Sequence, residues 1–181
     1  MIILAIDAAT NLGWAHGEPG GKPDYGSVDL AVHGRSDATI GWRAVEWLRD
    51  LLPELRPALV VYESPLDPRW KGAKTSRATG RRLLGLPFLI EACCYGFGVR
   101  DIREASARDV AKHFLGTTTF PGRTTAERRE AKKAATIRQC RLLGWRPQDD
   151  DAADSLALWE MQCALVRRDL ALRSTPLGLA A

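Results

Sequence analysis

The sequence predicts an α/β domain in which helices cover both faces of a mixed central β-sheet. Two short apolar runs, IILAI at residues 2–6 and ALVVY at 58–62, have the β-branched composition of central strands buried on both sides. Longer segments with helical spacing of apolar residues separate and follow these runs. The chain has 181 residues, 45% of them hydrophobic, which is enough for one substantial core. We expect residues 1–170 to form a single domain and residues 171–181 to be a flexible tail.

The first half of the chain is expected to contain strands and one helix. The Gly- and Pro-rich segment HGEPGGKPDYG predicts a turn, and YGSVDLAV after it alternates as a hairpin partner of the first strand would. Residues 36–52 have apolar side chains at helical spacing, with Ser36 or Asp37 available as the N-cap. The second buried strand follows Pro57 and ends at Glu63.

The second half of the chain is expected to be mainly helical. A long apolar helix is predicted from about residue 77 to 97, and Pro87 is expected to kink or divide it. VRDIREAS predicts a third strand, after which Ser106 caps a short helix. The charged segment 126–144 predicts a helix that ends at Gly144, and the last helix is expected from about Asp151 to Arg168.

Charge and cysteine content narrow the functional classes. The net charge is +4 and the isoelectric point about 9.0, which together with clustered Lys and Arg predicts a polyanionic partner. The four cysteines form no CxxC pair and have no neighbouring His, so neither a zinc site nor a disulfide framework is expected. Reduced thiols, no signal-peptide pattern and no 18-residue apolar run predict a cytoplasmic protein without a membrane partner.

Both buried strands end on a carboxylate, Asp7 in the first and Glu63 in the second. Ligands of open α/β sheets bind outside the carboxyl ends of the strands, so pairing of these strands would make the two residues neighbours. In QDDDAADSLALWE, Asp151 and Asp154 are three residues apart and share one helix face, about 5–6 Å apart. We therefore expect four carboxylates to converge. These residues, termed the acidic cluster, are Asp7, Glu63, Asp151 and Asp154.

A cluster of carboxylates needs a counter-charge, because like charges within about 4–6 Å raise one another's pKa. Mg²⁺ binds oxygen ligands, and two ions about 3.5–4 Å apart can stabilise the attacking and the leaving oxygen in phosphoryl transfer. The sequence thus predicts a Mg²⁺ site, with two ions expected. Asp149 and Asp150 have a simpler interpretation as capping residues at a helix start. Asp154 lies among small and apolar residues, where a carboxylate without a partner would be costly.

Three motifs, in this order, resemble the acidic motifs of RuvC-type Holliday junction resolvases, and most closely those of phage and prophage members. They are ILAIDAATNLGWA, ALVVYES and DDDAADSLALW, and the resemblance covers residues 2–165. It implies an RNase H-like fold and a homodimer that cuts four-way DNA junctions. It also implies that the acidic cluster binds Mg²⁺, for which Mn²⁺ is expected to substitute.

The same resemblance implies roles for further residues. A basic residue on the helix before the last acids positions the scissile phosphate in relatives, and Lys132 matches it, with Lys133 as the alternative. Relatives insert an aromatic residue near the junction centre. That position is Leu66 here, and Trp70 in the same loop is the alternative. The sequence departs from the family in having DAAT where many members have Asp-Pro-Gly after the first strand.

The segment RWKGAKTSRATGRR at residues 69–82 has six basic residues and no acid. Its charges predict contacts with DNA phosphates, and an aromatic or apolar side chain beside them would disturb base stacking. The alternative is that the segment is a solvated loop without a DNA-binding role. The predicted DNA-binding residues are Leu66, Arg69, Trp70, Lys71, Lys74, Arg77, Arg81 and Lys133.

We predict a Mg²⁺-dependent endonuclease that resolves four-way junctions by paired nicks and leaves 5′-phosphate and 3′-hydroxyl ends. Its predicted catalytic residues are the acidic cluster and Lys132. The alternatives are a nuclease for other branched DNA or RNA/DNA hybrids, a non-catalytic junction-binding protein, and an actin-like or sugar-kinase-like phosphotransferase, for which the chain leaves little room. The apolar segment LLGLPFLIEACCYGF either packs in the core or forms a two-fold interface.

Overall fold

The computed structural model describes residues 1–65 and 77–167, which form one mixed five-stranded sheet and five helices. The predicted C-terminal tail lies outside the described residues. The strands are β1 (Ile3–Asp7), β2 (Asn11–Gly17), β3 (Asp24–Asp29), β4 (Leu59–Glu63) and β5 (Asp101–Ala105). The helices are α1 (Asp37–Leu55), α2 (Arg77–Gly96), α3 (Ala107–Leu115), α4 (Thr125–Leu142) and α5 (Asp150–Val166).

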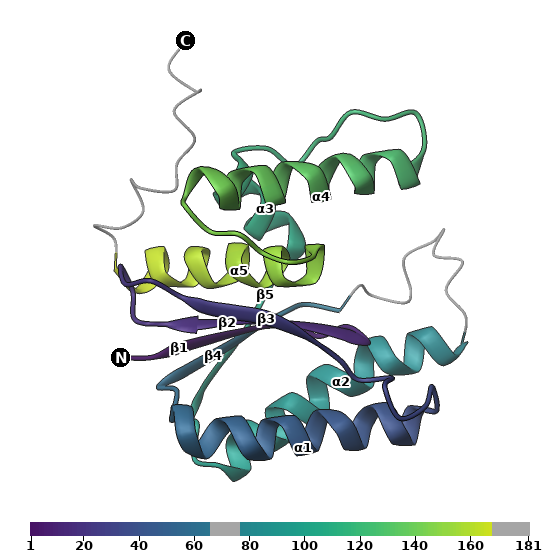
Figure 1. Ribbon diagram of the computed structural model, residues 1–181, viewed down its shortest axis with the longest axis vertical. Helices are drawn as coiled ribbons and strands as arrows, with labels where there is room; N and C mark the ends of the chain where they lie inside the picture. Colours follow the sequence, from purple (N-terminus) through teal and green to yellow (C-terminus); the bar gives the residue numbers. More distant parts are fainter. Residues whose placement is uncertain (66–76, 168–181) are drawn as a thin grey trace.

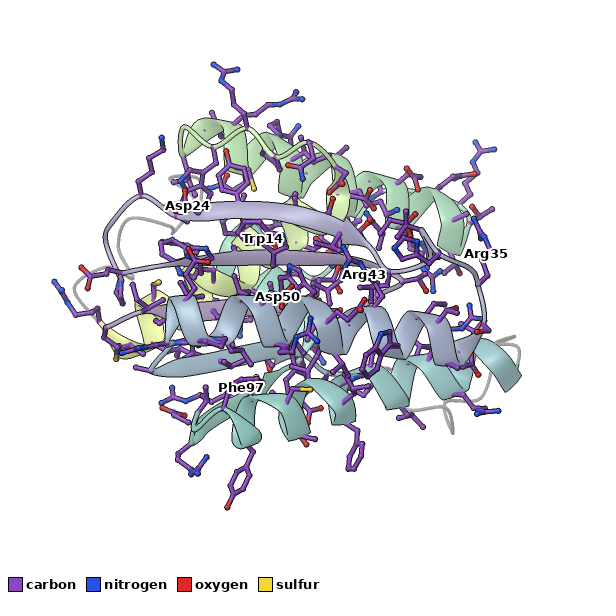
Figure 2. All side chains as sticks on the ribbon, turned by 60° about the horizontal axis from the view of Figure 1, so that its bottom comes forward. Trp14, Asp24, Arg35, Arg43, Asp50 and Phe97 are labelled. Atoms are coloured by element: carbon purple, nitrogen blue, oxygen red, sulfur yellow. The ribbon has the colours of Figure 1, made fainter. Side chains whose placement is uncertain are left out.

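The sheet has the strand order β3-β2-β1-β4-β5. β1 pairs in parallel with β4 and β4 in parallel with β5, whereas β2 and β3 pair antiparallel on the other side of β1. Helices cover both faces: α1 and α2 lie on one, and α5 lies on the other with α3 and α4 beyond it (Figure 1). Figure 2 shows α1 and α2 side by side across their face of the sheet. The predicted fold class is confirmed.

Alternation along the central strands supplies a core on each face. Ile3 and Ala5 of β1 belong to the core under α5, whereas Leu4 and Ile6 belong to the core under α1 and α2. The period of two along a strand therefore places Asp7 on the α5 face. β4 repeats the pattern with Leu59 and Val61 on the α5 side, which puts the side chain at position 63 on that face as well. α5 itself is buried along most of its length, as expected for a helix packed between a sheet and other helices.

Side chains cap the helices at their N-termini. Ser36 accepts a hydrogen bond from the Thr39 amide at the start of α1, and Ser106 does the same from the Asp109 amide for α3, as predicted. Of the two alternatives predicted at Pro87, a kink or a division, the division is wrong, because α2 is one continuous helix through this residue. None of the described helices has the length and apolarity needed to cross a membrane.

The predicted hairpin partner of the first strand is wrong. β2, which was not predicted, pairs with β1, and β3 at Asp24–Asp29 pairs with β2 instead. β2 has the sequence NLGWAHG, in which two glycines and two polar residues weaken the composition that identifies a strand. Of these, Gly13 has a specific packing role at the site described next.

Candidate active site

Parallel pairing of β1 and β4 brings Asp7 and Glu63 to one edge of the sheet. Ile6 lies opposite Tyr62, so one further step of the same register sets Asp7 beside Glu63 on strands about 4.8 Å apart. Both side chains lie on the α5 face by the alternation described above. Glu63 ends a strand, as predicted, and does not lie on a helix.

The start of α5 is fixed to the same edge by its N-cap. Asp149 accepts a hydrogen bond of 2.8 Å from the Ala152 amide and one of 2.5 Å from the Ser27 hydroxyl of β3. The capping role predicted for Asp149 is thus confirmed. Asp150 instead forms an ion pair with Lys133, with 2.6 Å between Oδ2 and Nζ.

Gly13 lets α5 approach the sheet directly beside Asp7, its partner in the β1–β2 register. A Cβ at this position would lie 2.1 Å from the carbonyl oxygen of Asp151 and 2.5 Å from the carbonyl carbon. No side chain fits there, so the backbone of the first turn of α5 rests on the backbone of β2. From the same strand, Asn11 Nδ2 donates a hydrogen bond of 2.6 Å to Asp151 Oδ2. Sequence reasoning missed both contacts, because the strand that carries Asn11 and Gly13 was not itself predicted.

The structure therefore brings the whole acidic cluster together, and its members perturb one another. The pKa of Asp7 is raised well above its ordinary value, first by burial and then by the charges of Glu63, Asp154 and Asp151. Burial is also the main cause of the raised pKa of the other three members, which are Glu63, Asp151 and Asp154. All four side chains keep some exposed surface, so solvent and ions have access to them.

Lys132 of α4 supplies the positive charge nearest to these acids. Its Nζ lies 3.6 Å from Asp154 Oδ2, and its charge opposes the rise in the pKa of Asp7, Glu63 and Asp154. Lys133 is the neighbouring alternative, but its ion pair is with Asp150. Of the two lysines, Lys132 has the geometry that the predicted catalytic role requires, and that role stays a prediction.

The donors of the acidic cluster suit a hard divalent cation, because all of them are carboxylate oxygens whose charges repel one another. Within residues 1–65 and 77–167, however, no group of three or more His, Cys, Asp or Glu side chains is placed to hold a metal ion as it stands. Two members are already engaged, Asp151 with Asn11 and Asp154 with Lys132. The cluster thus fits a metal in its chemistry. Binding would require Asp154 to leave Lys132, whereas Asp151 could bind through Oδ1 while its Oδ2 keeps the hydrogen bond from Asn11.

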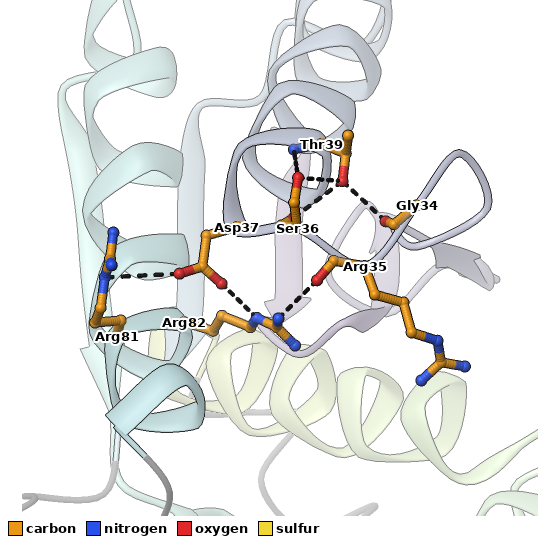
Figure 3. Close-up of polar contacts among 7 residues, drawn as sticks. All are labelled: Gly34, Arg35, Ser36, Asp37, Thr39, Arg81 and Arg82. Carbon is orange, nitrogen blue, oxygen red and sulfur yellow. Dashed lines mark hydrogen bonds and ion pairs between the residues drawn. The ribbon is translucent and has the colours of Figure 1, made fainter.

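Most of the predicted DNA-binding residues cannot be placed. Leu66, Arg69, Trp70, Lys71 and Lys74 lie outside the described residues, and Arg77 is the first residue of α2. Arg81 lies on α2 with Nε 3.6 Å from Asp37 Oδ2, beside Arg82, which bonds the same carboxylate at 2.7 Å (Figure 3). The Arg81 side chain is 71% exposed, so its ion pair is weak and does not prevent contact with a phosphate.

Comparison with known proteins gives matches in structure only. No protein-family model matches the sequence, and no curated protein matches it significantly. RuvC of Thermus thermophilus in complex with a Holliday junction substrate superposes with a TM-score of 0.64 at 15% identity, over 92% of this chain and 96% of that chain. A second structure of Thermus thermophilus RuvC gives a TM-score of 0.60 at 18% identity, over 92% and 96%. The chain has a RuvC-like fold.

A third match broadens the range of RuvC-like structures. The yeast mitochondrial Holliday junction resolvase Ydc2 superposes with a TM-score of 0.57 at 13% identity, over 94% of this chain and 83% of that chain. The RuvC-like fold thus extends over nearly the whole chain. These structures do not support the predicted placement in the phage and prophage branch.

Proposed function

We propose that the protein is a metal-dependent endonuclease that resolves four-way DNA junctions. The observation that carries the proposal is the convergence of the acidic cluster at the carboxyl ends of β1 and β4 in a RuvC-like fold. One neighbour with this fold is a RuvC bound to a Holliday junction substrate. A shared fold alone does not determine function, so the proposal depends on the chemistry of the acidic cluster.

In this proposal the acidic cluster holds Mg²⁺, with two ions expected and Mn²⁺ able to replace them. When bound, the metal supplies the positive charge that balances the carboxylates and the developing charge on a phosphate. Burial and mutual repulsion raise the pKa of Asp7, which means that the site stabilises an added cation more than an exposed carboxylate group would. Asn11 and Gly13 keep Asp151 against β2 while its side chain serves as a ligand.

The residues of the chain then act on the scissile phosphate. Asp151 or Asp154 accepts a hydrogen bond from the attacking water and takes its proton as the oxygen bonds to phosphorus. The bond from phosphorus to the 3′-oxygen breaks, and this oxygen takes a proton from a solvent water molecule, which leaves a 3′-hydroxyl and a 5′-phosphate. Lys132 moves its ammonium group from Asp154 to the phosphate and stabilises its negative charge.

Two subunits would place two such sites on opposing strands of a junction, so that paired nicks release two duplexes. The exposed apolar side chains of α2 are suited to a two-fold interface: Leu84 is 48% exposed, Phe88 72% and Tyr95 63%. Arg81 and Lys133, with the basic segment 69–77, would bind the arms through their phosphates.

The direct test is cleavage of labelled four-way, Y-shaped, linear and RNA/DNA hybrid substrates, each with Mg²⁺ and with EDTA. The proposal predicts symmetric nicks in the four-way junction, only with the metal. Preferential cutting of the hybrid would instead indicate an RNase H activity. Junction binding without cutting would indicate a non-catalytic junction-binding protein.

A further inference from the structure

A pocket of about 400 Å³ opens next to the acidic cluster, between α3 and α4. It is lined by Ala107, Arg108, Ala111, Thr118, Phe120 and Lys132, and we term it the α3–α4 pocket. Lys132 belongs to both places, because its Nζ also lies 3.6 Å from Asp154 Oδ2. The pocket volume is near the lower end of the range of about 300–1,000 Å³ for small-ligand sites. Lys132 therefore links this pocket to the acidic cluster.

The shape of the pocket suits a flat ring. Ala107 and Ala111 are four residues apart on α3, so their small side chains share one face and leave room in front of it. Phe120 is partly buried, yet it belongs to neither of the two hydrophobic cores. An aromatic ring beside a cavity offers a stacking surface for a nucleic-acid base.

The charge of the pocket suits a phosphodiester strand. Arg108 is exposed, and within the described part of the chain its side chain has no ion-pair or hydrogen-bond partner. Arg108 and Lys132 are the charged residues of the lining, so both charges are positive. A nucleotide between them would have a phosphate near each cation, while the exposed hydroxyl of Thr118 can donate to or accept from a base edge.

We propose that the α3–α4 pocket binds the nucleotide adjoining the scissile phosphate on the cut strand. The base stacks on Phe120, Arg108 binds the phosphate beyond it, and Thr118 contacts the base edge, so the pocket sets the base preference at the cut. The proposal rests on the proposed junction-cutting function and names a part of the substrate that the acidic cluster does not contact.

The test is junction binding in EDTA, with one base removed in turn at each position around the crossover. Wild-type protein is expected to lose about 10-fold in affinity when the base at the pocket is missing. Phe120→Ala is expected to lose about 10-fold on the intact junction and to be insensitive to removal of that base. Trp42→Ala is the matched control, because Trp42 is an aromatic residue that is 60% exposed on α1, across the sheet from the pocket. This control is expected to bind as wild type does.

Two results would overturn the pocket and leave the junction-cutting function intact. One is wild-type affinity of Phe120→Ala for the intact junction, and the other is the same loss in both proteins when the base is removed. A wild-type protein that does not prefer four-way over linear DNA would overturn the proposed function and the pocket together.

A second variant covers the case in which Phe120→Ala is less stable than wild type. Arg108→Gln alters an exposed side chain, with Arg49→Gln of α1 as its control. Arg108→Gln is expected to weaken binding and to reduce the slope of log affinity against log salt by about one. An unchanged affinity and slope would overturn the assignment of Arg108, and with it the pocket.

Discussion

Gly13→Ala is expected to impair the site by displacing the first turn of α5. The added Cβ would lie 2.1 Å from the Asp151 carbonyl oxygen, whereas ordinary contacts begin near 3.4 Å, so the backbone must separate by about 1.3 Å. Overpacking of this kind costs about 1–3 kcal/mol of stability. A displacement of about 1 Å in a catalytic group can lower the rate about 10²-fold. Asp151 moves with the helix, so metal binding should weaken as well.

The assay measures single-turnover cutting of a four-way junction over a Mg²⁺ titration, together with the rise in melting temperature that Mn²⁺ produces. Gly41→Ala is the matched control, because its Cβ would meet Leu89 Cδ1 at an ordinary 3.7 Å inside α1. That variant should be neutral or slightly more stable, by about 0.5–1 kcal/mol. Wild-type rate and metal response in Gly13→Ala, at unchanged stability, would refute the proposed contact between β2 and α5.

Three further predictions concern the charges around the acidic cluster. Burial and neighbouring carboxylates raise the pKa of Asp7, so the native state binds its proton more tightly than the unfolded state. The metal-free protein should therefore lose stability as the pH rises above the ordinary pKa of 3.8. In EDTA at neutral pH, Asp7→Asn should raise the melting temperature, by about 2–4 °C for each kcal/mol of stability gained. The same variant should abolish cutting. A lower melting temperature in that variant would contradict this sign. Lys132→Met should reduce single-turnover cutting by about 10²–10³-fold. Lys133→Met, which removes ion pairs with Asp150 and Glu130 and one proposed phosphate contact, should reduce cutting at saturating protein far less, and equal losses would refute the distinction. Asn11→Ala should weaken Mn²⁺ binding by about 10–100-fold in calorimetry because Asp151 loses its hydrogen-bond donor, and unchanged affinity would exclude this positioning role.

The parts of the fold that follow local rules could be predicted from the sequence. Apolar runs identified β1 and β4, and Ser36 and Ser106 identified the starts of α1 and α3. The meeting of Asp7 and Glu63 was expected if the two buried strands paired, and β1 and β4 do pair in parallel. These features depend on residues within a few positions of one another, or on a general rule of α/β sheets.

Features that depend on contacts between distant segments could not be predicted. β2 was missed because its glycines weaken the strand composition, and the reason for Gly13 is a helix more than 130 positions later in the chain. The preference for Lys132 over Lys133 at the acidic cluster could not be settled from two adjacent lysines, since it depends on how α4 is rotated against α5. A binding role for Phe120 and Arg108 could not be predicted, because neither belongs to a motif and they meet Lys132 only in the folded chain.

Anomalous diffraction from crystals grown with Mn²⁺ tests the central claim most directly. Our proposal predicts manganese peaks among Asp7, Glu63, Asp151 and Asp154, with Asp154 released from Lys132. Well-ordered side chains at these positions without a manganese peak at saturating concentration, and with the Lys132–Asp154 ion pair intact, would contradict it.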